Sequence, residues 1–301
     1  MCKRMAGYIV YNGFWNAAPS DPVRRLEAAA AKRGVTLIPI PNTELIVSTA
    51  PTVTVRTVGG QRLGRGDFAL FWDKDTRLAL ALQDSGVHLY NSAQAVAACD
   101  DKGETHRRLA AAGIPMPRTL LAPMTYVEVT SAVEPFLHAA EEELGFPMVI
   151  KECYGSFGRQ VYLASDGEQL RRQVYTLGAR PFILQEFVTA SAGEDTRLYM
   201  VGGRVAAAIR RRSETDFRAN VELGGTAQPY TPTDAEARLA QLCCRVLGLQ
   251  FGAVDLLHDE QGMPLVCEVN SNAYMAGLIA CTGVDVAGAI VDEVLTLERI
   301  G

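Results

Sequence analysis

The chain has 301 residues, of which 48% are hydrophobic and 21% charged, a composition typical of a globular protein that argues against disorder. The net charge of -5 argues against general nucleic-acid binding, because nucleic-acid phosphates attract a basic surface. The apolar stretch that follows Lys3 and Arg4 is too short for a signal peptide or a membrane span, so we expect no membrane association.

The first hundred residues alternate short apolar runs with helical patterns, which predicts an α/β layer with a parallel sheet. A helix is expected from Asp21 to Arg33, because a proline at 22 suits the first helical turn and Gly34 suits a left-handed exit. The other expected elements are strands over 8–11, 35–40, 68–72 and 87–91, and a hairpin or loop over 53–65.

The run Trp72-Asp73-Lys74-Asp75 directly follows one of these strands. In α/β proteins, ligands bind in the crevice beyond the carboxyl ends of the strands. The run is therefore a candidate for substrate contact, and a charged turn is the alternative interpretation.

A new pattern begins near residue 100, where we place the first domain boundary. Asp101 to Glu104 resembles a capping box that opens a helix ending at Gly113. Thr233 and Glu236 have the same spacing at the start of a second long helix. The remaining expected elements are strands over 148–153, 161–164, 182–188, 196–201, 204–210, 252–257 and 265–269, and helices over 166–177, 233–247 and from 284 onward.

A lysine and a glycine loop form the first chemical signal. The expected strand Val149-Ile150-Lys151 is followed by Gly155-Ser156-Phe157-Gly158. Glycines allow backbone N–H groups to approach a phosphate closely, and the lysine supplies positive charge. A tight hairpin with a surface lysine is the alternative.

Two neighbouring expected strands carry Asp255, Glu268 and Asn270. Glu268 and Asn270 are two residues apart and therefore point to the same face of one strand. Polar side chains on an apolar strand need a partner, and carboxylate and amide oxygens suit Mg²⁺. A solvated sheet edge is the alternative.

Arginines gather between these two signals. Five of them lie within a short stretch of the chain: Arg197, Arg210, Arg211, Arg212 and Arg218. Charge runs are usually solvated faces. Phosphoryl transfer, however, needs cations near the moving phosphate, and arginine offers a rigid fork of donors for it.

Cysteines and histidines give no catalytic signal. The seven cysteines have no C-x-x-C spacing, which favours reduced thiols in a cytoplasmic protein. The four histidines lack zinc-like spacing, so we expect them to be structural or exposed.

Taken in order, these motifs resemble the RimK-like ATP-grasp ligases. The resemblance covers about two thirds of the chain and runs through Asp100-Asp101-Lys102, Pro147 to Lys151, Gly155 to Gly158, Gln185 to Val188, Asp195-Thr196-Arg197, Arg211-Arg212, Asp216 to Asn220, Gly224-Gly225, Asp255, Glu268-Val269-Asn270 and Thr282 to Asp285.

The resemblance implies an ATP-grasp fold, in which two α+β lobes hold ATP behind an α/β pre-ATP-grasp domain. The implied division is residues 1–100 for the N-terminal domain, 101–188 for the nucleotide-clasping lobe and 189–301 for the metal-binding and catalytic lobe. A homo-oligomer is left open.

The resemblance also implies site residues. The nucleotide would be held by Lys102, Lys151, Gly155, Ser156, Phe157 and Gly158, with Gln185, Glu186, Phe187 and Val188 as the hinge that meets adenine. Asp255, Glu268 and Asn270 would bind Mg²⁺, with two ions expected and Mn²⁺ as an alternative. Arg211 and Asn220 would steady an acyl phosphate, and Arg197 belongs to the same catalytic set.

The implied reaction is ATP-dependent amide formation between a small carboxylic acid and the amine of an amino acid or peptide. A small-molecule kinase and a nucleotide-binding regulator without turnover are the alternatives. The surplus of arginines suggests capture of a second carboxylate, such as that of glutamate. Glutamate-adding members commonly have a small residue, Ser and Pro after Glu-x-Asn, whereas this chain has Ser271-Asn272-Ala273-Tyr274, so the acceptor is left open.

Overall fold

The computed structural model describes residues 6–14 and 19–300, and these residues form four sheets. The N-terminal sheet has the order β2-β1-β6-β7 and is parallel throughout, as the sequence predicts. Its strands are β1 (Ala6–Tyr11), β2 (Thr36–Pro41), β6 (Phe68–Trp72) and β7 (His88–Tyr90). Its helices are α1 (Asp21–Lys32), α2 (Thr76–Asp84) and α3 (Ala93–Asp100).

Beside this sheet lies a small antiparallel sheet, of which two strands fall within residues 53–65, the segment expected to be a hairpin or loop, and the third precedes that segment. It consists of β3 (Leu45–Ser48), β4 (Thr54–Thr57) and β5 (Arg62–Leu63). Val55 and Leu63 pack against the parallel sheet, which explains why this segment is ordered.

The middle of the chain forms an antiparallel sheet in the order β10-β9-β11-β8. Its strands are β8 (Thr119–Leu121), β9 (Met148–Glu152), β10 (Val161–Ala164) and β11 (Phe182–Glu186), and its helices are α5 (Glu134–Leu144) and α6 (Gly167–Thr176). Both helices pack their apolar sides on this sheet. Helix α4 (Lys102–Ala111) leads into this lobe.

The last third forms a second antiparallel sheet in the order β14-β13-β12-β15-β16. Its strands are β12 (Glu194–Val201), β13 (Arg204–Arg212), β14 (Thr226–Pro229), β15 (Phe251–His258) and β16 (Pro264–Asn270). Its helices are α7 (Asp234–Leu247), α8 (Ala276–Thr282) and α9 (Val286–Ile300). Short 3₁₀ turns cover Asn42–Glu44, Ser131–Val133, Thr189–Ser191 and Val221–Leu223.

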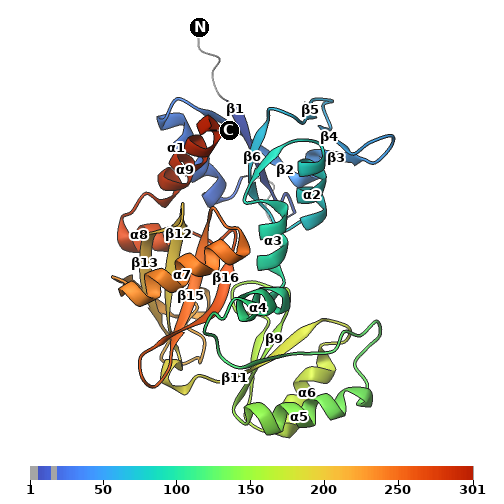
Figure 1. Ribbon diagram of the computed structural model, residues 1–301, viewed down its shortest axis with the longest axis vertical. Coiled ribbons are helices and arrows are strands. Elements are labelled where there is room, and N and C mark those ends of the chain that lie inside the picture. The colour runs from blue at the N-terminus through green and yellow to red at the C-terminus, as the bar shows by residue number, and fades with distance from the viewer. Residues whose placement is uncertain (1–5, 15–18, 301) are drawn as a thin grey trace.

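The C-terminal helix α9 lies against α1 of the N-terminal sheet, and both are at the top of Figure 1. Arg33, which follows α1, donates to Asp292 of α9 at 2.7 Å, and Tyr90 of β7 donates to Glu298 of α9 at 2.7 Å. One apolar core therefore runs from the N-terminal sheet into the last sheet. The lobe with α5 and α6 lies at the other end of the molecule (Figure 1). The division at residues 100 and 188 stays a prediction.

Cap chemistry explains where the helices begin. Thr233 and Glu236 form both hydrogen bonds of a capping box, as predicted. At α4 only half of the predicted box forms: Asp101 accepts from the backbone of Gly103 and Glu104, while the Glu104 side chain pairs with Arg107 instead.

None of the helices over residues 6–14 and 19–300 combines the length and apolar character needed to cross a bilayer.

Candidate active site

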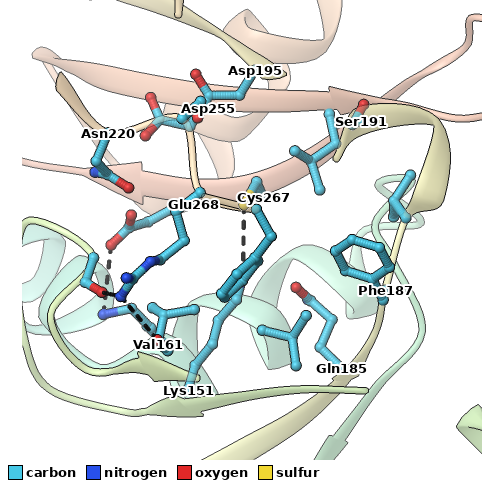
Figure 2. Close-up of a pocket in the computed structure, with 18 of the residues that line it drawn as sticks. Lys151, Val161, Gln185, Phe187, Ser191, Asp195, Asn220, Asp255, Cys267 and Glu268 are labelled. Carbon is cyan, nitrogen blue, oxygen red and sulfur yellow. Dashed lines mark hydrogen bonds and ion pairs between the residues drawn. The ribbon is translucent and has the colours of Figure 1, made fainter. Parts of the chain in front are cut away.

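The first pocket lies between the sheet of the middle lobe and the sheet of the last lobe. Figure 2 shows Asp195 and Asp255 on one side of it and Lys151 and Gln185 on the other. The predicted residues that line it are Lys102, Lys151, Gly155, Ser156, Gly158, Gln185, Glu186, Phe187, Val188, Arg211, Asn220, Asp255 and Glu268. The fold thus brings motifs from distant parts of the chain to one place.

Two lysines reach this pocket from different elements. Lys151 stands on β9, is 6% exposed, and donates from Nζ to Sγ of Cys267 at 3.6 Å. Lys102 follows the cap of α4, and its Nζ lies 3.4 Å from the Gly155 carbonyl and 3.5 Å from Oε1 of Glu268. Both ammonium groups are therefore buried in the pocket, where a bound anion could accept hydrogen bonds from them in place of, or together with, their present acceptors.

A β-bulge shapes the opposite wall. Asp255 pairs with Glu268, but the next pair is Leu256 with Val266, so Cys267 is the extra residue on β16. A bulge re-aims side chains, and here Cys267 and Glu268 both line the pocket although they are neighbours in sequence. The sequence alone does not predict Cys267 as a pocket residue, because the alternation rule for a regular strand places it on the other face.

Asp255 is held by two guanidinium groups. Arg197 binds both its oxygens at 2.7 Å, and Arg211 donates to its Oδ2 at 3.0 Å. Arg211 also binds both oxygens of Asp195, at 2.7 and 2.6 Å. Burial opposes ionisation of Asp255, but Arg197 and Arg211 outweigh it and lower its pKa to about 2. The carboxylate is therefore ionised at neutral pH.

The surplus of arginines that the sequence suggested is not present in the fold, and that argument for a second carboxylate was wrong. Arg210 lies 4.6 Å above the Tyr230 ring and pairs with Glu194 at 3.6 Å. Arg212 is exposed. Arg218 is paired with Asp216 at 2.7 Å. Alternation along β13 sends only the middle arginine of the run into the pocket.

The glycine loop is tied to the last lobe. Arg218 donates from Nη1 to the carbonyl oxygens of Gly158 at 2.6 Å and Val161 at 3.1 Å. Gly158 has a φ of 69°, and a Cβ there would lie 2.7 Å from Oδ1 of Asn220. Only glycine therefore suits both this conformation and this close approach.

The predicted hinge, Gln185 to Val188, begins in the last two residues of β11 and lines the pocket. Gln185 is 2% exposed and donates to Oγ1 of Thr119 at 2.8 Å. Phe187 meets Phe217 of the last lobe edge to face, with ring centroids 6.2 Å apart. An apolar wall with a fixed amide beside it suits a flat heterocyclic ring.

The oxygen ligands predicted for a metal fit Mg²⁺ in their chemistry. Glu268 and Asn270 lie on one strand, and Asp255 is paired with Glu268 on the next. Asp255 already accepts three hydrogen bonds, so it has little capacity left for an ion. Across residues 6–14 and 19–300, no three His, Cys, Asp or Glu side chains form a ready metal cage. Mg²⁺ tolerates such a set, because nucleotide phosphates and waters usually complete its shell.

A second pocket adjoins the first and opens toward the N-terminal sheet. The two pockets share Ser156, Asn220 and Glu268. Three predicted site residues line only the second pocket: Phe157, Arg197 and Asn270. Its other lining residues are Tyr11, Asn12, Ser20, Pro22, Trp72, Asp73, Lys74, Glu222, Asn272, Ala273 and Tyr274.

The run Trp72-Asp73-Lys74-Asp75 was predicted as a candidate for substrate contact. Its first three residues line this second pocket, whereas Asp75 caps helix α2. Tyr11 and Asn12 were missed. Tyr11 ends the neighbouring parallel strand β1 and Asn12 follows it, so the same rule about strand ends could have found them.

Comparison with known proteins places these features in a family context. Residues 99–294 match the RimK-like ATP-grasp domain family. A probable alpha-L-glutamate ligase of Xanthomonas oryzae pv. oryzae (strain MAFF 311018) is 37% identical over 223 residues, which are 72% of this chain and 72% of that protein. Beta-citrylglutamate synthase B of Danio rerio is 33% identical over 230 residues, 75% of this chain and 55% of that protein.

Among solved structures, the ATP-grasp ligase PsnB complexed with minimal precursor, Mg and ADP superposes with a TM-score of 0.69. The alignment covers 97% of this chain and 98% of that chain, at 19% identity. At this identity the likeness concerns the fold.

Proposed function

Because the chain belongs to the RimK-like ATP-grasp family, we propose that it joins a small carboxylic acid, activated by ATP, to the amine of an amino acid or peptide. The family match confirms the resemblance seen in the sequence and the predicted fold class, and it makes the chain an ADP-forming ligase. ATP and Mg²⁺ are the implied cofactors.

One observation carries the proposal: the two pockets share a wall of Ser156, Asn220 and Glu268. A nucleotide in the first pocket and a second substrate in the other would therefore meet at these residues. Catalysis by positioning needs such a meeting point, because bound reactants avoid the entropy cost of a bimolecular encounter.

In the first pocket, we assign the phosphates to Lys102, Lys151 and the backbone of Gly155 to Gly158. The adenine ring would lie by the hinge from Gln185 to Val188, next to Phe187. Lysine ammonium groups supply positive charge to the phosphates. Glycines have no side chain that would keep a phosphate away from the backbone N–H groups.

Glu268 and Asn270, with the remaining lone pair of Asp255 Oδ1, would hold the metal. Bound Mg²⁺ would neutralise charge on the phosphates. Two ions, or Mn²⁺ in their place, are part of this proposal.

The chemistry proceeds in two balanced steps. The acid's carboxylate oxygen attacks the γ-phosphorus, which releases ADP and leaves an acyl phosphate. The amine then attacks the acyl carbon, phosphate leaves, and the amine nitrogen gives up a proton. Arg211 and Arg197 supply fixed positive charge behind Asp255, and the Asn220 amide at the shared wall is placed to donate to the transferred group.

For the amine we propose glutamate. The names of two relatives, an alpha-L-glutamate ligase and a beta-citrylglutamate synthase, support this choice. The arginines do not, since the pocket-facing ones are paired with carboxylates.

We also propose a cytoplasmic location. The six cysteines in the described part of the chain are all free thiols, which fits a reducing compartment.

The test is a matrix of carboxylic acids and amines assayed for ADP release, with mass spectrometry of each positive mixture. We expect ADP only when an acid and an amine are both present, together with a product whose mass is their sum minus water. ADP release with a phosphorylated product and no amine would instead indicate a kinase.

A further inference from the structure

The second pocket opens where two parallel strands of the N-terminal sheet end. Tyr11 is the last residue of β1 and is paired with Trp72, the last residue of β6. Asn12 and Asp73 follow them, and all four residues line the pocket. The shared wall with Glu268 lines the same pocket, so a molecule that fills the pocket would contact the N-terminal sheet and the reaction site together.

Asp73 is buried there with one oxygen unused. It is 4% exposed, and its Oδ1 accepts from Nδ2 of Asn12 at 3.2 Å and from the backbone of Lys74 at 2.7 Å. Its Oδ2 is buried and accepts no hydrogen bond from the described residues. Burial raises the pKa of Asp73, against the opposing effect of the Lys74 and Asp75 backbone amides and of Asn12. A buried carboxylate oxygen without a donor is costly, so a donor from outside the protein would be favoured.

The cations around this carboxylate are already committed to other acids. Lys74 pairs with Asp100 at 2.9 Å, although it is the next residue in sequence. Arg197, which lines the same pocket, binds Asp255 at 2.7 Å. No Lys, Arg or His within residues 6–14 and 19–300 forms an ion pair with Asp73. Within the described residues, the charge that would complement Asp73 is therefore left for a ligand to supply.

Four aromatic side chains also belong to this wall. Tyr11, Trp72, Phe157 and Tyr274 all line the pocket. Trp72 is stacked on Phe251 with ring centroids 5.9 Å apart, which fixes its orientation. Aromatic faces attract ammonium groups and do not attract carboxylates. The wall and Asp73 therefore favour the same kind of ligand.

We propose that Asp73 binds the ammonium group of the amino-bearing substrate, so that the second pocket selects molecules with a protonated amine over acids that lack one. This inference rests on the proposed function and deepens it, because it assigns a class of substrate to one pocket and names the group that recognises it. Asp73 forms no covalent bond in this role, and the bound ammonium gives one proton to solvent before the neutral amine attacks the acyl phosphate.

The first experiment uses wild-type protein with Mg²⁺ and ADP and pairs of probes that differ only in an amino group. L-Glutamate is compared with glutarate, and L-phenylalanine with 3-phenylpropanoate, by titration calorimetry. At least one amino member is expected to bind about ten- to a hundredfold more tightly than its partner, the range of a charge-assisted hydrogen bond. Because this comparison needs no variant, it is independent of any folding defect.

The second experiment compares Asp73→Asn with Asp84→Asn, the same change at an exposed helix end. Asp73→Asn is expected to bind the amino probe as weakly as its partner without the amine, with unchanged ADP affinity. Its melting temperature should be equal or higher, because an uncompensated buried charge is removed. Asp84→Asn should behave as wild type.

Three outcomes would overturn the inference: no amino probe binds, the amino and amine-free members bind equally, or Asp73→Asn binds the amino probe like wild type. These outcomes are separate from failure of the proposed function, which would appear as absence of an amide product with every acid and amine. Amide formation by wild type with an unchanged KM for the amine in Asp73→Asn would leave the ligase in place and remove Asp73 from it.

Discussion

Arg218 and Gly158 connect the two lobes, because Nη1 of the arginine donates to the glycine carbonyl at 2.6 Å. Asp216 fixes the guanidinium by accepting from Nε at 2.9 Å and from Nη2 at 2.7 Å. The glycine loop is thus held against the sheet that carries the acidic residues. The loop contributes Ser156 to both pockets, so its position affects both.

Replacing Arg218 with lysine should loosen the glycine loop. Lysine keeps the charge but cannot bind Asp216 at two points and two carbonyls together. We expect the KM for ATP to rise about tenfold, with faster amide exchange over residues 155–158. Arg212→Lys, at an exposed position of β13, is the matched control. Unchanged exchange and KM would show that the contact does not hold the loop.

Lys151→Ala should weaken ATP binding about ten- to a hundredfold, because a charge-assisted hydrogen bond to phosphate is lost. The fold should persist, since the one hydrogen bond that Nζ of Lys151 makes to the described residues is a long contact with Sγ of Cys267 at 3.6 Å. Arg159→Ala removes an equal charge from the exposed neighbour of the loop and should change affinity little. Equal nucleotide affinity of Lys151→Ala and wild type by calorimetry would take Lys151 out of the site.

Glu268→Gln and Asn270→Ala should each abolish turnover at ordinary Mg²⁺ levels. Each change removes one oxygen ligand from the face of β16 that lines the second pocket, and Glu268→Gln also removes a negative charge. Raising Mg²⁺ should recover part of the activity of Glu268→Gln. Glu260→Gln, in an exposed turn, is the control. A mutant with the wild-type rate and Mg²⁺ dependence would contradict the metal assignment.

His106 should make the protein less stable in acid. It is 5% exposed, and burial, with Lys151 and Lys102 nearby, lowers its pKa to about 3. In the unfolded state the histidine has a pKa of about 6.5, so on acidification it binds a proton there before it does so in the folded state. The contribution of His106 to stability is therefore undiminished above a pH of about 6.5 and falls as the pH drops toward 3.

Below a pH of about 6.5, the free energy of unfolding of the wild type should fall by about 1.4 kcal/mol per pH unit more than that of His106→Gln. Urea unfolding at several pH values measures this difference. His138→Gln, at an exposed histidine on α5, should follow wild type. Parallel curves for wild type and His106→Gln would contradict a neutral buried histidine.

Local chemistry is what the sequence predicted well. The start of α7 depends on Thr233 and Glu236 alone, and the exit of α1 depends on the left-handed Gly34. The parallel sheet followed from alternating apolar runs and helices. By contrast, α5 has Pro135 in its first turn and few buried residues, so its pattern was too weak to be recognised.

Long-range pairing could not be read from the chain. Arg197 binds Asp255 because β12 and β15 are aligned with these residues opposite each other, and that register is a property of the whole sheet. The bulge that turns Cys267 into the pocket has the same origin. The arginines therefore looked like spare binding groups in the sequence, whereas the sheet assigns each pocket-facing one a carboxylate.

The most direct test of the central claim is the fate of the oxygen atoms of the acid. An acid labelled with ¹⁸O in its carboxylate is incubated with ATP, Mg²⁺ and the amine, and the amide and the inorganic phosphate are analysed by mass spectrometry. Activation as an acyl phosphate predicts that one labelled oxygen from the acid appears in the phosphate for each amide formed. Unlabelled phosphate beside labelled amide, or ADP release without any amide, would contradict the account.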